Sequence, residues 1–229
     1  MKKALIILIC LFVYQISISQ NCESISPYKE GMYMEYTNYN KKGKIVSVEK
    51  HLVASVENQG GSLVIVIKTS VIEGKRNSSA EKYVLKCDNG NFKVDMTNYT
   101  SHQSDNQEGS LSVEAVGDFI EFPSGMQPGT LLEDGSIAIS IGNGESTMAI
   151  ADMSVLNRKV LAKDNLTTPA GTFDGYKISF DYLFDMGLLK VRGSGIEWYI
   201  DGIGIIRTES YSKKGKLRWS RELTKISGQ

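Results

Sequence analysis

The stretch GIEWYIDGIGIIRTESYSKKGK, residues 195–216, decides how this chain folds. It contains a G-x-G pair, Gly202 and Gly204, of the kind found in phosphate-binding loops. A dinucleotide loop also needs a third glycine and a helix directly after it, because the helix amides bind the phosphate. Strand-forming residues follow Gly204 instead, and then a hairpin tip. We therefore interpret the stretch as two antiparallel strands, with the two glycines allowing a bend or a close backbone approach.

Apolar and polar residues alternate with a period of two along much of the chain, as in residues 46–57, 137–141 and 176–184. Such alternation is typical of half-buried antiparallel strands whose apolar side chains face the core. On this basis Glu49 and His51 are expected on the polar face of their strand. The run LVIVI at 63–67 is expected to be covered on both faces. In the first stretch, the residues expected to point inward are Ile196, Trp198 and Ile200.

Short turn sequences rich in Gly, Asn and Asp separate these runs at regular intervals. No stretch of 12 residues has a helical period. The sequence predicts an all-β fold with little helix: one curved antiparallel sheet of about ten to twelve strands, forming a half-barrel or distorted barrel over residues 20–229. The motif Y-x-K-K-G-K occurs at 39–44 and at 211–216, and each copy predicts a hairpin tip with glycine in the left-handed region. A duplication and two independent hairpins explain the pair equally well.

Residues 1–19 have the layout of a secretory signal peptide, with two lysines, an apolar run at 4–14 and small residues before the cleavage site. The apolar run is shorter than the roughly 20 residues that a membrane-spanning helix needs. We expect an exported protein, periplasmic or secreted, with no transmembrane segment after cleavage. An uncleaved anchor and a lipoprotein modified at Cys22 are the alternatives, although Asn21 does not fit a lipobox.

Two cysteines, Cys22 and Cys87, remain after signal cleavage, and an even count in an exported protein predicts a disulfide. The loop that it closes predicts roughly 4 kcal/mol of stabilisation as an upper figure. A buried free thiol at Cys87 is the alternative.

The chain has 26 basic and 26 acidic residues, so no global field attracts nucleic acid, and we expect no nucleic-acid partner.

Several segments together resemble a family of exported Gram-negative proteins known only as a domain of unknown function. They are KEGMYMEYTNYNKKGK at 29–44, CDNGNFKVDM at 87–96, TTPAGTFDGYKISFD at 167–181 and the Trp-Tyr strand followed by G-I-G in 195–216. The resemblance implies an exported, all-β protein and supplies no catalytic residues. A more distant likeness in architecture links the chain to half-barrel carriers of lipids and lipoproteins in the periplasm, and architecture alone does not imply function.

Sequence motifs for catalysis or metal binding are absent. His51 and His102 have no cysteine or carboxylate at ligand spacing, and neither H-E-x-x-H, C-x-x-C nor G-x-S-x-G occurs. Ser194 lies between glycines, which a turn explains better than a nucleophile. We therefore expect no catalytic residue, no metal and no cofactor. The carboxylates worth testing for glycosidic chemistry are Asp181, Asp185, Glu197 and Asp201.

Aromatic and basic residues suggest a binding surface instead. An apolar groove is predicted from six residues: Tyr36, Val48, Leu85, Phe180, Trp198 and Trp219. Lys213, Lys214 and Arg218 are predicted near its mouth, as a patch facing an anionic group. Ordinary core packing and the protection of sheet edges by lysine are the alternatives.

The leading functional hypothesis is a non-catalytic envelope protein that binds lipid, another amphipathic ligand or an envelope protein. A structural or assembly accessory of a secretion or surface system is the first alternative, and a hydrolase is the second.

Overall fold

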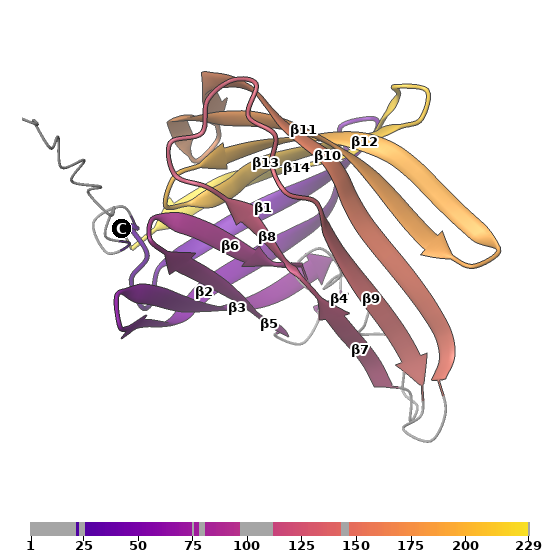
Figure 1. The fold of residues 1–229 in the computed structure, drawn as a ribbon, viewed down its shortest axis with the longest axis horizontal. Coiled ribbons are helices and arrows are strands. Elements are labelled where there is room, and N and C mark those ends of the chain that lie inside the picture. The colour runs from indigo at the N-terminus through magenta and orange to yellow at the C-terminus, as the bar shows by residue number, and fades with distance from the viewer. Residues whose placement is uncertain are drawn as a thin grey trace, which may run out of the picture.

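A computed structural model describes Cys22 and residues 26–74, 76–77, 81–96, 112–142 and 147–228. These residues form one antiparallel sheet of fourteen strands (Figure 1). The predicted all-β, single-sheet fold is therefore confirmed, with more strands than the predicted ten to twelve. Within the described part of the chain, no helix is long and apolar enough to cross a membrane.

The strands follow one another along the chain with mostly short turns. They are β1 (Tyr33–Asn40), β2 (Ile45–Gln59), β3 (Ser62–Glu73), β4 (Arg76–Asn77), β5 (Glu81–Asp88), β6 (Asn91–Asp95), β7 (Ser112–Gly117), β8 (Phe119–Phe122), β9 (Gly135–Gly142), β10 (Thr147–Thr168), β11 (Gly171–Met186), β12 (Leu189–Ile200), β13 (Gly204–Ser212) and β14 (Leu217–Ser227). Their order across the sheet is β7-β9-β10-β11-β12-β13-β14-β1-β2-β3-β5-β6-β8, with β4 paired to β3. The first and last hairpins of the chain are therefore neighbours, joined by the β1–β14 pair.

Asp118 joins the two edges of this sheet. It lies between β7, which pairs with β9, and β8, which pairs with β6. Its N–H donates to the carbonyl of Ser136 at 3.0 Å, and its carbonyl accepts from the N–H of Met96 at 3.2 Å. The sheet thus curls into a nearly closed barrel whose two edges meet in one continuous segment.

Before β1, Cys22 and residues 26–32 cover one end of the interior. We call these residues the plug, and this end of the barrel the plugged end. Cys22, Tyr28 and Met32 are all buried in the core there. The Tyr28 hydroxyl donates to the carbonyl of Ile203 at 2.5 Å, which ties the segment to the β12–β13 turn. Apolar burial and this hydrogen bond together hold the plug in place.

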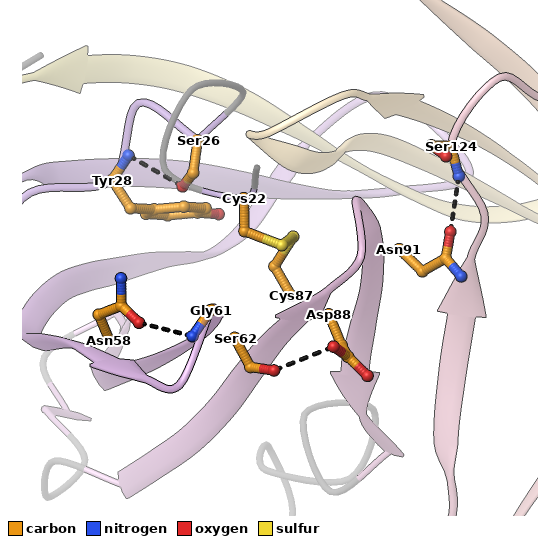
Figure 2. Close-up of a disulfide and its surroundings, with 10 residues drawn as sticks. All are labelled: Cys22, Ser26, Tyr28, Asn58, Gly61, Ser62, Cys87, Asp88, Asn91 and Ser124. Atoms are coloured by element: carbon orange, nitrogen blue, oxygen red, sulfur yellow. Dashed lines mark hydrogen bonds between the residues drawn. A yellow bond between two sulfur atoms is a disulfide. The ribbon is translucent and has the colours of Figure 1, made fainter. Parts of the chain in front are cut away.

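The predicted Cys22–Cys87 disulfide is confirmed, and it joins the plug to the end of β5 (Figure 2). The two Cα atoms are 5.8 Å apart, which is an ordinary separation for a disulfide. Both cysteines are fully buried. A sulfur bonded to Cys87 cannot also carry a thioether-linked lipid, so the lipoprotein alternative at Cys22 does not fit this structure.

Several predicted strand faces are confirmed. Ile137, Ile139 and Ile178 face the core, as alternation predicted. Across the interior, the ring of Phe122 on β8 stacks on that of Tyr199 on β12, with centroids 4.1 Å apart. Side chains from opposite walls therefore meet in the middle of the barrel.

Other predicted faces are wrong. On β2 the polar residues point inward: Glu49 is 0% and His51 1% exposed, whereas Leu52 is 43% exposed. On β12, Glu197 and Tyr199 are buried, so Ile196 and Trp198 lie on the opposite face. The run 63–67 also alternates, with only every second residue fully buried. The reason for the reversed face of β2 is a polar cluster inside the barrel, described below, which compensates buried charge by pairing.

Ser194 lies within β12 and not in a turn, which corrects the interpretation of the glycines around it. A Cβ at Gly195 would overlap the ring of Phe180, and one at Gly193 would overlap that of Tyr182, on the paired strand β11. The glycines therefore leave space for cross-strand aromatic rings that cover them.

Gly202 and Gly204 have the backbone role that the sequence predicted. Their φ angles are 79° and 94°, in the region that favours glycine, and they form the turn between β12 and β13.

Candidate functional site

The two Y-x-K-K-G-K tips lie side by side at the end of the sheet opposite the plug. β1 pairs with β14 so that Asn40 is opposite Trp219, which places the β1–β2 tip next to the β13–β14 tip. In Figure 1 the indigo tip and the yellow tip are neighbours at this end. We call residues 40–46 and 212–219 together the lysine rim, and this end of the sheet the rim end.

The two tips have the same backbone geometry. Gly43 and Gly215 have φ angles of 72° and 71°. In each tip the glycine N–H donates to the residue that ends the strand, at 2.8 Å to Asn40 and 2.7 Å to Ser212. The side chains of Asn40 and Ser212 also accept backbone N–H groups of their own tips. The predicted hairpin tips are thus confirmed, and both are held by hydrogen bonds within the turn.

The lysine rim is basic and exposed. It carries seven cationic side chains, all exposed: Lys41, Lys42, Lys44, Lys213, Lys214, Lys216 and Arg218. Neither range contains an acidic residue. Apolar side chains are exposed beside the cations, with Ile45 at 66% and Trp219 at 42%. The three residues of the predicted patch, Lys213, Lys214 and Arg218, are therefore part of a larger basic surface.

Protection of sheet edges does not explain these lysines. Edge strands are protected by lysine because their backbone groups are unpaired. The four strands that bear the rim, β1, β2, β13 and β14, are interior strands of the sheet, each paired on both sides. The edges of the sheet are β7 and β8, on the other side of the barrel.

A buried polar cluster lies on the inner face of the same strands. Arg221 on β14 places Nη2 2.8 Å from Glu49 Oε2 on β2, and Nε2 of His51 is 3.2 Å from the same oxygen. The other ring nitrogen of His51, Nδ1, is 3.0 Å from the Tyr83 hydroxyl. Asn38 on β1 donates to Glu49 Oε1 at 2.5 Å. The cluster thus links the two rim hairpins beneath their tips.

The charges of this cluster are stabilised by one another. Burial lowers the pKa of Arg221, but the charge of Glu49, the phenols of Tyr36 and Tyr83 and the hydrogen bond to Glu49 together outweigh burial and raise that pKa. The Arg221 guanidinium also stacks on Tyr36, with Cζ 3.9 Å from the ring centroid. Burial raises the pKa of Tyr83, so its phenol stays protonated. The arrangement is a compensated ion pair inside the barrel, closed to a substrate in solution.

The six residues of the predicted groove do not share one face. Tyr36, Leu85 and Phe180 are buried in the core, and Trp219 lies at the rim end of the same inner face. Val48 pairs with Thr37 and Trp198 with Lys177, which places both on the outer face. The register of the sheet, which alternation alone could not supply, separates them. Binding of a ligand by any of them stays a prediction.

The four candidate carboxylates are spread along one hairpin. Asp181 and Asp185 lie on the exposed face of β11, Glu197 points into the core from β12, and Asp201 lies at the plugged-end turn. Burial raises the pKa of Asp201, and a hydrogen bond from Lys190 lowers that of Asp185. Such a spread does not form a pair that could flank one glycosidic bond.

The remaining candidate residues are not arranged for catalysis in the part of the chain that the structure describes. His102 lies outside the described residues, and His51 is enclosed in the polar cluster. In the described part of the chain, no three His, Cys, Asp or Glu side chains are placed to hold a metal ion. An open hollow of about 390 Å³ does lie on β10–β12 beside the rim, lined by Leu156, Leu183, Arg192 and Lys213 among others.

A family model described as DUF3108-like matches residues 29–223, which is most of the chain. The chain belongs to the DUF3108-like family. This confirms the family resemblance inferred from the sequence. No curated protein matches the DUF3108-like chain.

Two solved structures share the fold of this DUF3108-like chain. One is a candidate exported protein with a YmcC-like fold from Bacteroides fragilis, with a TM-score of 0.76 and 23% identity over 89% of this chain and 99% of that one. The other is a candidate lipoprotein from Parabacteroides distasonis, with a TM-score of 0.77 and 23% identity over 88% of this chain and 97% of that one. At this identity the likeness shows the fold alone.

Four rim cations of the DUF3108-like chain were not predicted: Lys41, Lys42 and Lys44 on one tip and Lys216 on the other. The signal was present in the repeated Y-x-K-K-G-K motif, but nothing local predicts that β1 pairs with β14. The cluster of Glu49, His51 and Arg221 was not predicted either, because a polar residue in an alternating strand is ordinarily placed on the solvent side.

Proposed function

We propose that this chain is a non-catalytic binding protein of the bacterial cell envelope, and that it holds an amphipathic ligand or partner at its rim end. The lysine rim is the observation that carries the proposal. It offers seven exposed cations together with exposed Ile45 and Trp219 on two neighbouring hairpin tips. A surface with both charge and apolar area suits a partner that has both.

The interior of the barrel is filled by packed side chains, which favours binding at the surface over a reaction inside the barrel. Phe122 and Tyr199 stack in the middle of it, and Arg158 lies over the Phe122 ring. Glu49 and His51 are enclosed and paired, so a substrate could reach them only by displacing packed side chains. Catalytic groups need access to the reacting atoms, which these lack.

Location in the envelope has three supports. The layout of residues 1–19 is that of a secretory signal. The Cys22–Cys87 disulfide suits an oxidising compartment outside the cytoplasm. The two solved neighbours are named as a candidate exported protein and a candidate lipoprotein.

A second candidate, an assembly accessory that binds another protein, is favoured by the β11–β12 tip. This tip extends beyond the β13–β14 tip, because Gly193 on β12 is already opposite Ser212 at the end of β13. Its apolar side chains are exposed, and Leu188 is fully so. Exposed apolar side chains on a projecting hairpin can dock into a groove of a partner.

Site-specific photo-crosslinking in the source bacterium tests the proposal. A photoreactive residue replaces Lys42 or Lys214 on the rim, and a matched control replaces Lys68, an exposed lysine on β3. We expect adducts from the two rim positions and none from Lys68. The mass of the adduct separates a lipid or other small ligand from a protein partner.

Equal adducts from Lys68 and the rim, or none from either, would contradict binding at the rim. A photoreactive residue at Leu188 addresses the second candidate. A protein adduct from Leu188, with no adduct from Lys42 or Lys214, would replace the first function by the second.

A further inference from the structure

We propose that the lysine rim docks on the surface of an anionic lipid bilayer, with Ile45 and Trp219 at the depth of the headgroups. The inference rests on the proposed function, since it names the occupant of the same rim. Four features of the rim support it: its net charge, its apolar side chains, its width and its position relative to the plug.

The charge of the rim is not neutralised from within. None of its seven cationic side chains forms an ion pair with a carboxylate among the described residues. The carboxylates of β13 and β14, Glu209 and Glu222, both pair with Arg207, at 2.6 and 3.8 Å. Glu49 on β2 pairs with Arg221. The field of the rim is therefore positive and complements an anionic surface.

Apolar side chains lie among the cations at the tips. Ile45 directly follows Lys44, and Leu217 and Trp219 flank Arg218. All three are exposed. Tryptophan favours the interface between water and lipid, because its ring is apolar while its N–H can bind a polar group. Cations beside exposed aliphatic and indole groups are typical of protein surfaces that lie in this interface.

The width of the rim favours an array of headgroups over a single small anion. The β13–β14 and β1–β2 hairpins are neighbours in the sheet, so the centres of their tips are two strand spacings, or about 10 Å, apart. Each tip carries three lysines at matching places, which are Lys41, Lys42 and Lys44 on one and Lys213, Lys214 and Lys216 on the other. Seven cations over such a span exceed what one phosphate could contact, whereas a bilayer presents many anionic groups in one plane.

The plug and the rim lie at opposite ends of the strands. Tyr33, where β1 begins, pairs with Ser227, whereas Asn40, where it ends, pairs with Trp219. Eight residues of extended strand separate the two ends by about 24 Å. A molecule docked through its rim would therefore hold the Cys22–Cys87 disulfide away from the lipid.

Sedimentation with sucrose-loaded vesicles tests this inference on the mature, oxidised chain. Vesicles of phosphatidylethanolamine with phosphatidylglycerol supply the anionic surface, and phosphatidylcholine vesicles supply a neutral one. The rim variant is K42Q/K44Q/K214Q/K216Q. Its matched control, K29Q/K68Q/K82Q/K159Q, removes the same charge from four exposed lysines elsewhere. Circular dichroism and melting temperature establish that both variants are folded.

We expect binding to anionic vesicles, little to neutral ones, and weakening by added salt. Each cation near an anionic surface strengthens binding by about fivefold, so the loss of four should weaken the binding of the rim variant by roughly 600-fold. The control variant should bind within about threefold of the native chain, because none of its four lysines belongs to the rim.

Tryptophan emission gives a second readout, since the chain has two tryptophans. In W198F the remaining Trp219 should shift to the blue and be quenched by brominated lipid, whereas in W219F the remaining Trp198 should not. Failure to bind anionic vesicles, or equal losses in both charge variants, overturns the lipid inference. If the rim then still forms adducts with a protein or polysaccharide, the proposed function stands and only the lipid inference is wrong. If no envelope component reacts at the rim, the proposed function and the lipid inference are both wrong.

Discussion

The two ends of the barrel differ in where their apolar side chains lie. At the plugged end, Cys22, Tyr28 and Met32 are buried, and a disulfide and a hydrogen bond to Ile203 hold them. At the rim end, Ile45 and Trp219 are exposed beside seven cations. Burial of apolar area stabilises a fold by roughly 25 cal/mol per Å², so the plugged end contributes to stability in a way that the rim does not.

The difference indicates a division of roles within one sheet. Changes at the plugged end and in the interior should destabilise the fold, whereas changes at the rim should leave the fold intact and alter only what it contacts. The polar cluster stands between the two, since Glu49 and Arg221 belong to rim hairpins but point into the core.

Glu49→Ala should have the largest effect. It leaves the Arg221 guanidinium buried without the carboxylate 2.8 Å away, and breaking a buried pair costs about 3–5 kcal/mol. Urea unfolding followed by circular dichroism measures the loss. As a control, Glu57→Ala removes an exposed carboxylate from the same strand and should change stability by less than about 0.5 kcal/mol. Similar losses in the two variants would show that the cluster adds nothing special to the core.

Removal of the disulfide should have the second-largest effect on stability. The double variant C22S/C87S frees a loop with a sequence separation of 65 residues and should lower the free energy of unfolding by up to about 4 kcal/mol. The plug should loosen first, because one of its links to the barrel is lost. Calorimetry of the variant, and of the native chain with and without reductant, measures the change. An unchanged melting temperature in both experiments would contradict the stabilising role of the plug.

Gly204→Val should cost more than about 1 kcal/mol, because a β-branched side chain is strained at a φ of 94°. Thermal unfolding of the variant measures this cost. A normal melting temperature combined with the loss of a bound nucleotide would instead restore the phosphate-loop interpretation of the G-x-G pair.

The rim variant K42Q/K44Q/K214Q/K216Q should change stability least, within about 0.5 kcal/mol, since its four side chains are exposed and unpaired among the described residues. The same urea titration as for Glu49→Ala makes the comparison direct. A loss of several kcal/mol would mean that the rim lysines serve the fold, and the division between the two ends would fail.

Local features of the fold were predictable from the sequence. The alternation in residues 176–184 predicted a strand with the correct inner face, and the motifs ending at Lys44 and Lys216 predicted two hairpin tips. The Cys22–Cys87 bond followed from export and an even number of cysteines. Each of these depends on neighbouring residues or on simple counting.

Features that depend on distant pairing were not predictable. The inner face of β2 was predicted wrongly, because Glu49 is stabilised inside the barrel by Arg221, which lies far away in sequence. The rim could be seen only in part, because its two halves meet through the β1–β14 register. The proposed groove divides between two faces for the same reason, since a strand of unknown register can place its side chains on either side.

Hydrogen–deuterium exchange of residues 20–229, with and without anionic vesicles, reports on both ends of the barrel in one experiment. We expect exchange to slow by about twofold or more in peptides covering 38–46 and 211–219, and peptides covering 26–33 and 200–206 at the plugged end to be unchanged. Slower exchange at the plugged end, with none at the rim, would contradict the assignment of contact to the rim and of stability to the plug.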